Sequence, residues 1–460
     1  MLCLVPVAPA RSLTADEQRL VGFLSGTEIK ATVGALCCNR FAGRKAGEPG
    51  QVLAGRYIAD RFSGMGMGRI AGSYEEKLTM RYTLVKSMDD IAAILIYKNG
   101  NRAAKKVFAY PDYYGRGGVK VNSRVVFVGH GATDSSGRDD YAGLDVRGKI
   151  VVWLSGGGGA MLNEASEISR VADAYRHGAA ASLIVGLKTQ IHQESGGFGL
   201  AGPIANFPCL SIRPEMARVL FPGSWDSLVS GKPSATVGRV GSQVTISVPT
   251  IYNPEQATQN ILCMLPGGDP KGDLVILGAH YDHLGVCGKG IFCGADDNAS
   301  GSAVMLEVAR AFAKSGMKPK RGIVFAAWTG EEAGLVGSNY FVKSPPFPLA
   351  RLKAAVNMDM VGVGARGEFM AVGRNAYPQQ FKSLSASAQE LGLTILPKES
   401  PGVSDHLAFS RKGIPSLLVY SAGEHPNYHT TRDRPELVDP VILENTAKLV
   451  AVTIWRLANE

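Results

Sequence analysis

Histidine and acidic residues gather in short polar segments that follow hydrophobic runs of the chain. The segment "GAHYDH" closes one such run with His280, Asp282 and His283. Imidazole and carboxylate groups serve as metal ligands, as acid–base pairs, or as ordinary hydrogen-bonding groups at the ends of strands. The two histidines alone do not separate these alternatives.

Four further segments carry the same residue types. Carboxylates and imidazoles that are brought together lose solvation, and like charges repel, unless a cation is present. Five such segments in one chain therefore predict a metal site. The residues are Asp296 and Asp297 after "FCG", Glu331 and Glu332 after "IVFAAW", Asp359 after "AAVNM", and His425, Tyr428 and His429 downstream of "SLLVY".

The ligand types narrow the choice of metal. Nitrogen and oxygen ligands without thiolates are typical of Zn²⁺, with Co²⁺ or Mn²⁺ as substitutes. The seven cysteines include no C-x-x-C pair, so a thiolate zinc site is not expected. The polar set is too large for a single tetrahedral zinc that keeps an open position, whereas two metal ions that share a bridging carboxylate account for it.

The elements that must position these residues alternate along the final 200 residues. "DLVILGAH", "RGIVFAAW", "KAAVNM" and "PSLLVY" indicate buried strands, and the segments between and after them have the apolar spacing of helices. This alternation predicts an α/β fold with a mostly parallel, doubly wound sheet flanked by helices on both faces. Functional groups in such sheets collect beyond the carboxyl ends of the strands, where the polar segments lie.

The middle of the chain has a different character. Short β-branched runs such as "SRVVFVGHGA" and "GKIVVWLSGGGG" are broken by glycines, with one helical segment between them. We therefore expect an inserted β-rich domain at residues 105–249 within a discontinuous catalytic domain of residues 14–104 and 250–460. Residues 1–13 are an N-terminal tail or the remnant of a secretory signal, because their apolar stretch ends in an A-x-A pattern but lacks a basic segment.

Composition excludes several classes of protein. The charged content of 19% and the hydrophobic content of 45% are typical of a globular protein. The net charge of +9 is spread over the chain without a basic block, so nucleic-acid binding is not expected. No apolar run approaches the roughly 20 residues of a membrane span. Cys287 and Cys293 either form a disulfide or remain two free thiols.

Taken together, the motifs resemble those of a known family. "GAHYDH", "GADDNASG", "WTGEEAGLVGS", "NMDM" and "YHT" are similar to the motifs of the co-catalytic di-zinc exopeptidases, which include bacterial leucyl-type aminopeptidases and glutamate carboxypeptidases. The resemblance follows the chain in order over most of residues 14–100 and 250–460. "YAGLDVRGKIVV" and "HGAAASLIVG" in the insert resemble the protease-associated domain of many members.

The resemblance implies a specific ligand set for two Zn²⁺ ions. In this set each metal has its own histidine and its own carboxylate, and one further carboxylate is shared. The implied ligands are His280 and Asp359 for one metal, Glu332 and His429 for the other, and Asp296 as the bridge.

The resemblance also implies the catalytic groups. Glu331 is the general base, and Tyr428 donates a hydrogen bond to the oxygen on which charge develops. Asp282 accepts the second ring N–H of His280 and fixes its tautomer. His283 is left with a hydrogen-bonded structural role or a place in the substrate pocket. Asp297 and Asn298 are expected to cap the helix that follows them, and the "SDHLAF" segment has no assigned role.

The implied function is a zinc-dependent aminopeptidase that hydrolyses N-terminal residues from peptides. A carboxypeptidase or dipeptidase of the same fold and a glutaminyl cyclase are the alternatives, and the inserted domain disfavours the cyclase. A metal-free, receptor-like binding protein is disfavoured because all ligands and the base are present. The insert and the N-terminal stretch together favour a periplasmic or secreted location, while the oligomeric state is not indicated.

Overall fold

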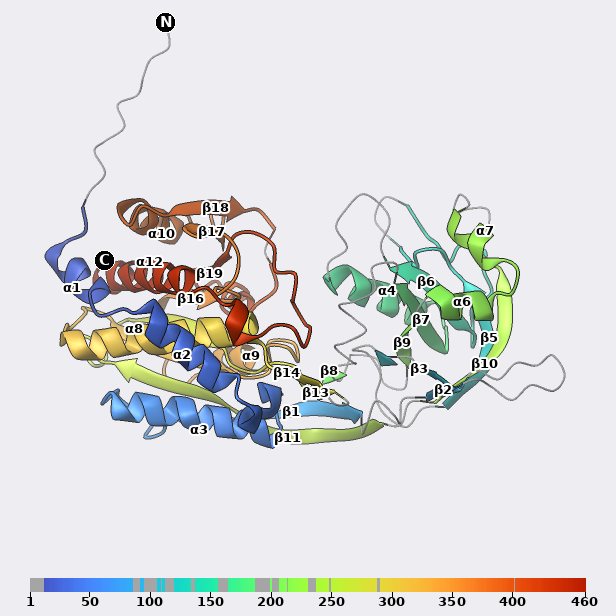
Figure 1. Ribbon diagram of the computed structural model, residues 1–460, viewed down its shortest axis with the longest axis horizontal. Coiled ribbons are helices and arrows are strands. Elements are labelled where there is room, and N and C mark those ends of the chain that lie inside the picture. Colours follow the sequence, from blue (N-terminus) through green and yellow to red (C-terminus); the bar gives the residue numbers. More distant parts are fainter. Residues whose placement is uncertain are drawn as a thin grey trace, which may run out of the picture. The chain divides into compact units, whose positions relative to one another are not determined.

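Figure 1 presents the computed structural model of the 460-residue chain. Of the predicted N-terminal tail or signal remnant at residues 1–13, residues 1–11 lie outside the described part of the chain. The residues described are 12–85, 92–94, 106–108, 110–111, 120–133, 137–155, 164–186, 199–200, 207–212, 214–230, 237–247, 250–287, 290–400 and 402–460.

The chain divides into two compact units. Unit 1 consists of Met1–Thr79, Ala257–Val286 and Ile291–Glu460, and unit 2 consists of Met80–Gln256 and Cys287–Gly290. Unit 2 begins well before residue 105, where the change of sequence texture placed the insert. The difference arises because two long strands, β1 (Glu75–Val85) and β11 (Thr250–Leu265), each contribute residues to both units.

Unit 1 contains the sheet that the sequence predicts. The four predicted strands form its centre and run parallel, in the order β15, β12, β16, β19. Antiparallel neighbours flank them, since β11 pairs with β15 and β17 pairs with β19, while β18 runs parallel to β17. The strands are β12 (Leu274–His280), β15 (Gly322–Trp328), β16 (Leu352–Met358), β17 (Glu368–Val372), β18 (Thr394–Lys398) and β19 (Ser416–Ser421).

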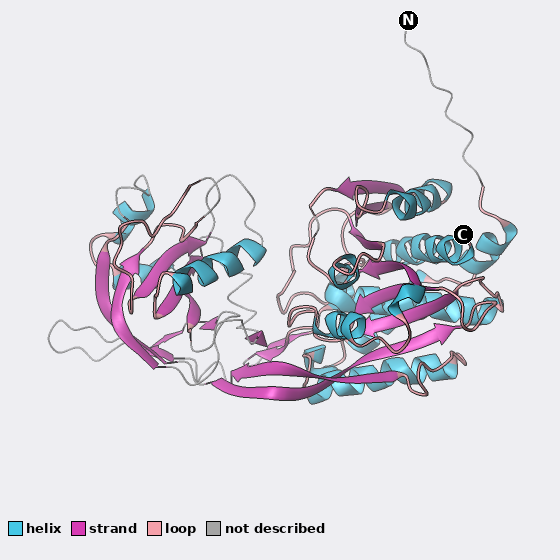
Figure 2. Cartoon of the chain, turned by 180° about the vertical axis from the view of Figure 1, so that it is seen from behind, coloured by secondary structure: helices cyan, strands magenta, loops and turns pink. Residues whose placement is uncertain are grey.

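Both faces of this sheet are covered, as a continuous apolar strand requires. All seven residues of β12 are buried, and alternate residues belong to different cores: Val275 and Leu277 to one, Leu274 and Ile276 to the other. The first core includes the long helices α8 and α12, which lie along the strands in Figures 1 and 2, and the second includes α9 and α11. The bounds are α8 (Gly301–Ser315), α9 (Val336–Lys343), α11 (His406–Ser410) and α12 (Pro440–Asn459).

The N-terminal helices complete unit 1. Thr14 is the N-cap of the first helix, because its Oγ1 accepts a hydrogen bond from the Glu17 backbone N–H and Glu17 Oε2 accepts one from the Thr14 N–H at 2.8 Å. Within the described ranges, no helix combines the length and apolar character needed to cross a bilayer. The remaining elements of unit 1 are α1 (Ala15–Val21), α2 (Gly26–Leu36), η1 (Asn39–Arg44), α3 (Pro49–Gly64), η3 (Ala295–Ser300), η4 (Leu349–Arg351), α10 (Pro378–Glu390) and η5 (Pro435–Leu437).

Unit 2 has a sheet and a hydrophobic core of its own. The sheet order is β10, β5, β6, β7, β9, β4, and the four central strands run parallel. Phe127, Phe221 and Trp225 contribute aromatic rings to its core. The elements include β4 (Tyr110–Pro111), β5 (Lys120–Phe127), β6 (Ile150–Ser155), α4 (Glu164–Arg176), β7 (Ala181–Gly186), β9 (Cys209–Ile212), α6 (Pro214–Leu220), α7 (Trp225–Ser230) and β10 (Val240–Ser247).

Short strand pairs account for the rest of the described chain. β2 pairs with β3, β8 pairs with the end of β1, and β13 pairs with β14. The likeness of the insert to a protease-associated domain stays a prediction. The bounds are β2 (Ala92–Ile94), β3 (Lys106–Phe108), β8 (Gly199–Leu200), β13 (Gly285–Cys287) and β14 (Gly290–Phe292).

Candidate metal centre

The polar residues lie where the parallel strands end. β12 ends at His280, and Asp359 follows directly after β16. Glu331 and Glu332 come three and four residues after the end of β15 at Trp328. Because parallel strands present their carboxyl ends at one edge of the sheet, these side chains meet there, as the sequence predicts.

One group of ligand atoms surrounds His280. Its Nε2 lies 3.1 Å from Asp359 Oδ1 and 3.4 Å from Asp297 Oδ1, and the ring is 1% exposed. Asp359 is held in place by Ser404, whose hydroxyl donates to Oδ2 at 2.7 Å. One ligand atom from each of His280, Asp297 and Asp359 lies within 4.8 Å of the others, so the three side chains can hold a metal ion.

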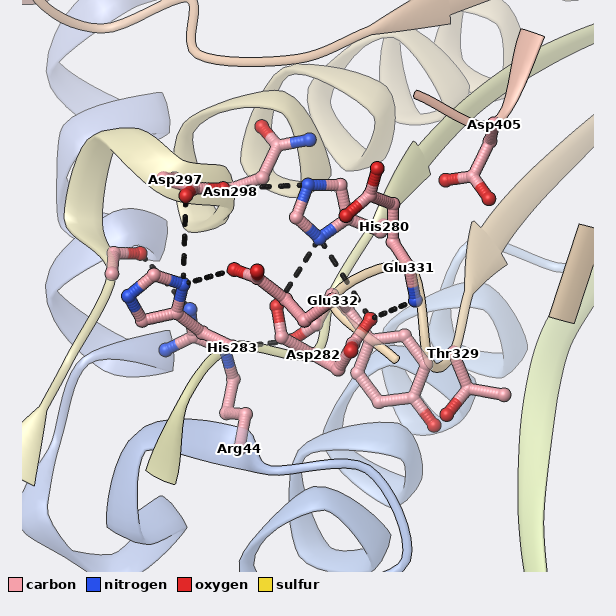
Figure 3. Close-up of polar contacts among 12 residues, drawn as sticks. Arg44, His280, Asp282, His283, Asp297, Asn298, Thr329, Glu331, Glu332 and Asp405 are labelled. Carbon is pink, nitrogen blue, oxygen red and sulfur yellow. Dashed lines mark hydrogen bonds and ion pairs between the residues drawn. The ribbon is translucent and has the colours of Figure 1, made fainter. Parts of the chain in front are cut away.

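A second group forms around Glu332, as Figure 3 shows in part. Glu332 Oε2 lies 3.1 Å from His429 Nε2, and Oε1 lies 2.7 Å from His283 Nδ1. His429 Nε2 is also 3.2 Å from Asp297 Oδ2. His283, Asp297 and Glu332 likewise bring one ligand atom each within 4.8 Å.

Asp297 belongs to both groups. Its Oδ1 faces His280, and its Oδ2 faces His429 at 3.2 Å. One carboxylate that presents a different oxygen to each of two ligand sets has the geometry of a bridging ligand. The sequence reasoning missed this position because it treated Asp297 as a helix cap.

The assignment of the bridge to Asp296 is therefore corrected. Asp296 Oδ1 accepts hydrogen bonds from the backbone N–H groups of Gly362 and Val363 at 2.8 and 3.1 Å, and Oδ2 lies 2.5 Å from His425 Nδ1. Its carboxylate is thus occupied away from both ligand groups. The two neighbouring aspartates diverge because the backbone leaves the helical region at Asp297, with φ −109° and ψ 94°.

Asn298 takes the capping role that the sequence assigned to both residues. Its Oδ1 accepts a hydrogen bond from the Gly301 N–H at 2.9 Å, at the start of α8. Its Nδ2 donates to the Met358 carbonyl at 2.9 Å, which ties the loop to the end of β16. Of the two residues, Asn298 is the one that accepts a hydrogen bond from the first residue of α8.

Asp433 holds the loop that carries Asp296 and Asp297, and this role was not identified from the sequence. Its Oδ1 accepts the Asp296 N–H at 2.9 Å, and its Oδ2 accepts the Asp297 N–H at 3.1 Å. Burial raises the pKa of Asp433 to about 8, with a further contribution from the Asp296 carboxylate. Asp433 therefore fixes the backbone that carries Asp297, a role visible only from its contacts.

Asp282 lies beneath His280, but not as the sequence predicts. His280 Nδ1 is 3.2 Å from the Asp282 backbone carbonyl and 3.7 Å from the Asp282 carboxylate. Asp282 Oδ1 instead accepts a hydrogen bond from the Glu331 N–H at 3.2 Å. Burial raises the pKa of Asp282 to about 8. The contact that fixes the His280 tautomer is therefore made by the Asp282 backbone carbonyl, whereas the Asp282 carboxylate accepts the Glu331 N–H.

Glu331 and Glu332 have pKa values displaced in opposite directions. Burial raises the pKa of Glu331 well above its usual range, although His280 opposes the shift. Burial also acts on Glu332, but the imidazoles of His429 and His283 outweigh it and hold the pKa of Glu332 well below its usual range. Neighbouring carboxylates shifted apart in this way suit an acid–base group beside a metal ligand.

Tyr428 adjoins the second group through its neighbour in the chain. Its ring stacks on the His429 ring, with centroids 3.8 Å apart and planes inclined by 19°. Tyr428 is half-buried and lines a small pocket together with Asp296, His425 and Asp433. Its predicted role as a hydrogen-bond donor to substrate stays a prediction.

Arg44 anchors the loops that carry the site. Its side chain is fully buried, and its guanidinium donates to the backbone carbonyls of Tyr281, Cys293 and Gly294 at 2.7, 2.7 and 2.9 Å and to that of Leu36 at 2.8 Å. The Tyr281 carbonyl lies two residues before His283, and the Cys293 and Gly294 carbonyls precede the Asp297 loop. Arg44 therefore links two ligand-bearing segments that are separate in the sequence.

Replacing Arg44 with methionine is expected to lower the free energy of unfolding of the metal-free protein by about 3–5 kcal/mol, because four buried carbonyls lose their donor. Urea denaturation measures this change. Arg411, whose side chain is exposed, is the matched control, and Arg411→Met should stay within about 0.5 kcal/mol of the wild type. Equal stability of both variants would show that the Arg44 bonds are replaced by water at little cost.

The donor set fits a metal centre. His280, His283 and His429 are buried beside Asp297 and Glu332, and burial of several carboxylates together is costly without a cation among them. The donors are nitrogen and oxygen atoms, as zinc accepts.

Cys293 is a free thiol that donates to the Asp433 carbonyl at 2.8 Å, in line with the free-thiol alternative for this residue.

A family model now identifies the region that holds these residues. Residues 260–454 match the model described as peptidase family M28. The match covers less than half of the chain, and it shows that this segment is similar to that family. The matched segment contains every residue of the two ligand groups.

Curated relatives of the chain include proteins named as aminopeptidases. Leupeptin-inactivating enzyme 1 of Streptomyces exfoliatus is 30% identical over 234 residues, covering 46% of this chain and 51% of the relative. Aminopeptidase YwaD of Bacillus subtilis (strain 168) is 31% identical over 212 residues, covering 44% and 45%. The chain thus spans about half the length of the curated relatives it matches.

Solved structures match the fold over nearly the whole chain. The aminopeptidase from Aneurinibacillus sp. strain AM-1 has a TM-score of 0.70 at 24% identity and covers 96% of both chains. BSAP, a zinc aminopeptidase from Bacillus subtilis, has a TM-score of 0.68 at 21% identity and covers 95% of this chain and 96% of its own. At these identities the likeness establishes the α/β fold.

Proposed function

We propose that the protein is a zinc-dependent aminopeptidase that removes N-terminal residues from peptides. The observation that carries the proposal is the position of Asp297 between two sets of histidine and carboxylate groups, with Oδ1 3.4 Å from His280 Nε2 and Oδ2 3.2 Å from His429 Nε2. This arrangement suits two metal ions that share one carboxylate. The aminopeptidase names of M28 relatives support the choice of reaction.

The residues divide between the two metals by their contacts. In each set one imidazole and one carboxylate lie within about 3 Å of each other, and Asp297 completes both sets. The proposed ligands are His280, Asp359 and Asp297 for the first metal, and Glu332, His429 and Asp297 for the second.

Glu331 is proposed as the general base. When bound, two divalent metal ions would polarise the scissile carbonyl and lower the pKa of water in the site. The raised pKa of Glu331 suits a group that takes a proton from the attacking water and returns it to the departing amine. The Asp282 carboxylate, which accepts the Glu331 N–H at 3.2 Å, holds the backbone of the base in place.

Tyr428 is proposed to donate a hydrogen bond to the oxygen on which negative charge develops. A donor aimed at this oxygen stabilises the transition state more than the substrate. The stacking of Tyr428 on His429 holds the phenol beside a proposed ligand and thereby supports the assignment.

The charges around the site favour recognition of an N-terminus over a C-terminus. A substrate carboxylate would require an arginine with free donors. The Arg44 guanidinium, which contacts the loops of the site, already donates hydrogen bonds to four backbone carbonyls. Arg44 therefore offers no pair of donors to a substrate carboxylate, which favours recognition of an N-terminus.

The test is a mass-spectrometric time course of zinc-loaded protein with one peptide in three forms: free, N-acetylated and C-amidated. We expect stepwise loss of residues from the N-terminus, which acetylation blocks and amidation spares. Loss from the C-terminus that amidation blocks would replace the proposal with a carboxypeptidase. Cyclisation of an N-terminal glutamine without cleavage would replace it with a glutaminyl cyclase.

We also propose a periplasmic or secreted location for the protein. The apolar stretch at residues 1–10, with its A-x-A pattern, supports this proposal. Cell fractionation of the native host with an antibody against the chain tests it. Recovery in the cytoplasmic fraction alone would contradict it.

A further inference from the structure

His283 remains without a role in the proposed reaction, although it lies within the metal centre. We propose that His283 is a positioning residue that holds Oε1 of Glu332 through its Nδ1–H, so that Oε2 is the oxygen offered to the second metal together with His429. The inference rests on the proposed function, because it presupposes that Glu332 is a ligand.

The distances separate this role from that of a further ligand. Two donors on one tetrahedral zinc with bonds of about 2.1 Å stand roughly 3.4 Å apart. His429 Nε2 approaches this spacing, at 3.1 Å from Glu332 Oε2 and 3.2 Å from Asp297 Oδ2. His283 Nδ1 does not, because it lies 2.7 Å from Glu332 Oε1 and 3.7 Å from Asp297 Oδ2. A separation of 2.7 Å is that of a charge-assisted hydrogen bond.

The tautomer of His283 agrees with the donor role. Its Nε2 is buried and has no hydrogen-bond partner among the described residues. If Nδ1 carries the proton and donates to Glu332, Nε2 keeps a lone pair and no N–H is left unsatisfied. If Nδ1 instead bound the metal, the proton would move to Nε2 and become a buried donor without an acceptor, which costs about 1–3 kcal/mol. Histidine ligands normally donate that second N–H to a partner.

The surroundings fix the ring in this orientation. The His283 side chain is fully buried, and its backbone N–H donates to the Arg44 carbonyl at 3.3 Å. Gly294 packs against the ring so closely that a Cβ at this position would lie 2.4 Å from Cγ and Cδ2 of His283. The His429 ring meets it edge to face, with centroids 5.8 Å apart. His283 therefore approaches Glu332 from one side while His429 approaches from the other.

The hydrogen bond from His283 to Glu332 Oε1 also affects how Glu332 would bind the second metal. A carboxylate held at Oε1 would offer only Oε2 to a metal ion, and Glu332 would then leave room in the site for water or substrate, as a catalytic zinc requires. Without the hydrogen bond, Glu332 would rotate about its final torsion and lose affinity for the metal.

The test compares two substitutions at His283 in the full-length chain. An asparagine side chain places an amide N–H near the position of Nδ1, whereas leucine fills the space without a donor. The background substitution Asp359→Asn removes a ligand of the first metal, so that the remaining ion reports on the second. Zinc affinity is measured by chelator competition, and Co²⁺ absorption reports the coordination number of the second site.

In the Asp359→Asn background we expect His283→Leu to weaken zinc binding about 10–100-fold, the range typical for loss of a group that orients a ligand. His283→Asn should restore affinity to within about threefold of the background, with an unchanged Co²⁺ spectrum. If asparagine fails as leucine does and the Co²⁺ spectrum changes, His283 is itself a ligand and the proposal is overturned. Unchanged affinity in the leucine variant would also overturn it.

A melting curve of each metal-free variant separates misfolding from loss of binding, because a purely structural role would lower stability without the asparagine rescue of affinity. The proposed peptidase activity can be refuted independently of the role of His283. Wild-type protein that binds two metals and cleaves no peptide would refute that activity while the affinity comparison at His283 still stands. Wild-type protein without a second metal site would refute both.

Discussion

Replacing Asp297 with alanine is expected to release both of the proposed metal ions together. Its two carboxylate oxygens face different ligand sets, 3.4 Å from His280 and 3.2 Å from His429. Loss of one side chain would therefore remove a ligand from each ion. We expect zinc affinity to fall by more than about 100-fold at both sites. This exceeds the 10–100-fold loss that is typical when a residue that only orients a metal ligand is replaced. Metal analysis after gel filtration measures the content.

The neighbouring residue provides a matched control. Asp296→Asn retains an acceptor for the Gly362 and Val363 N–H groups and changes only the charge beside His425. This variant should keep about two metals per chain. The opposite pattern, with metals lost from Asp296→Asn and kept by Asp297→Ala, would return the bridge to Asp296 and refute the assignment made from the structure.

Replacing Glu331 with glutamine will abolish most turnover while leaving the metals bound. Glutamine has the shape of glutamate but cannot accept the proton of the attacking water, and general-base catalysis contributes about 10²–10⁴-fold to the rate. We expect kcat to fall by about this factor, with metal content close to that of the wild type. The peptide time course and metal analysis on the same preparation measure both quantities.

Glu332→Gln is the comparison for this variant. Glu332 contacts His429 at 3.1 Å, and its lowered pKa marks it as the carboxylate that stays ionised. Its replacement should reduce metal content as well as turnover. If Glu331→Gln lost metal to the same extent, Glu331 would be a ligand and the roles of the two glutamates would need to be exchanged.

Arg44, Asp433 and His283 share one feature that bears on these experiments. None of them is a proposed ligand, yet each fixes a segment that carries one: Arg44 through four carbonyls, Asp433 through the Asp296 and Asp297 N–H groups, and His283 through Glu332 Oε1. The ligand geometry therefore depends on contacts from the loop before α3 and from the chain after β19. Substitutions in these segments are expected to change metal affinity without touching the ions.

The amino-acid sequence by itself determined the architecture and the place of the chemistry. Continuous apolar runs separated by amphipathic segments specify parallel strands with helices on both faces, because only that arrangement buries both sides of a strand such as β12. Once the strands are parallel, residues that follow them must gather at one edge, which located His280, Glu331, Glu332 and Asp359. The Thr14 cap was equally local, since a helix N-terminus needs a nearby acceptor.

Only the tertiary structure decided which neighbouring side chain faces the proposed metal site. Asp296 and Asp297 have the same chemistry and adjacent positions, and the choice between them depends on the Gly362 and Val363 amides, more than 60 residues away in the chain, which take up Asp296. His283 likewise acquires its role from Glu332, 49 residues distant. Sequence patterns report periodic burial and local capping, whereas the direction of a side chain in an irregular loop is set by partners that folding brings from elsewhere.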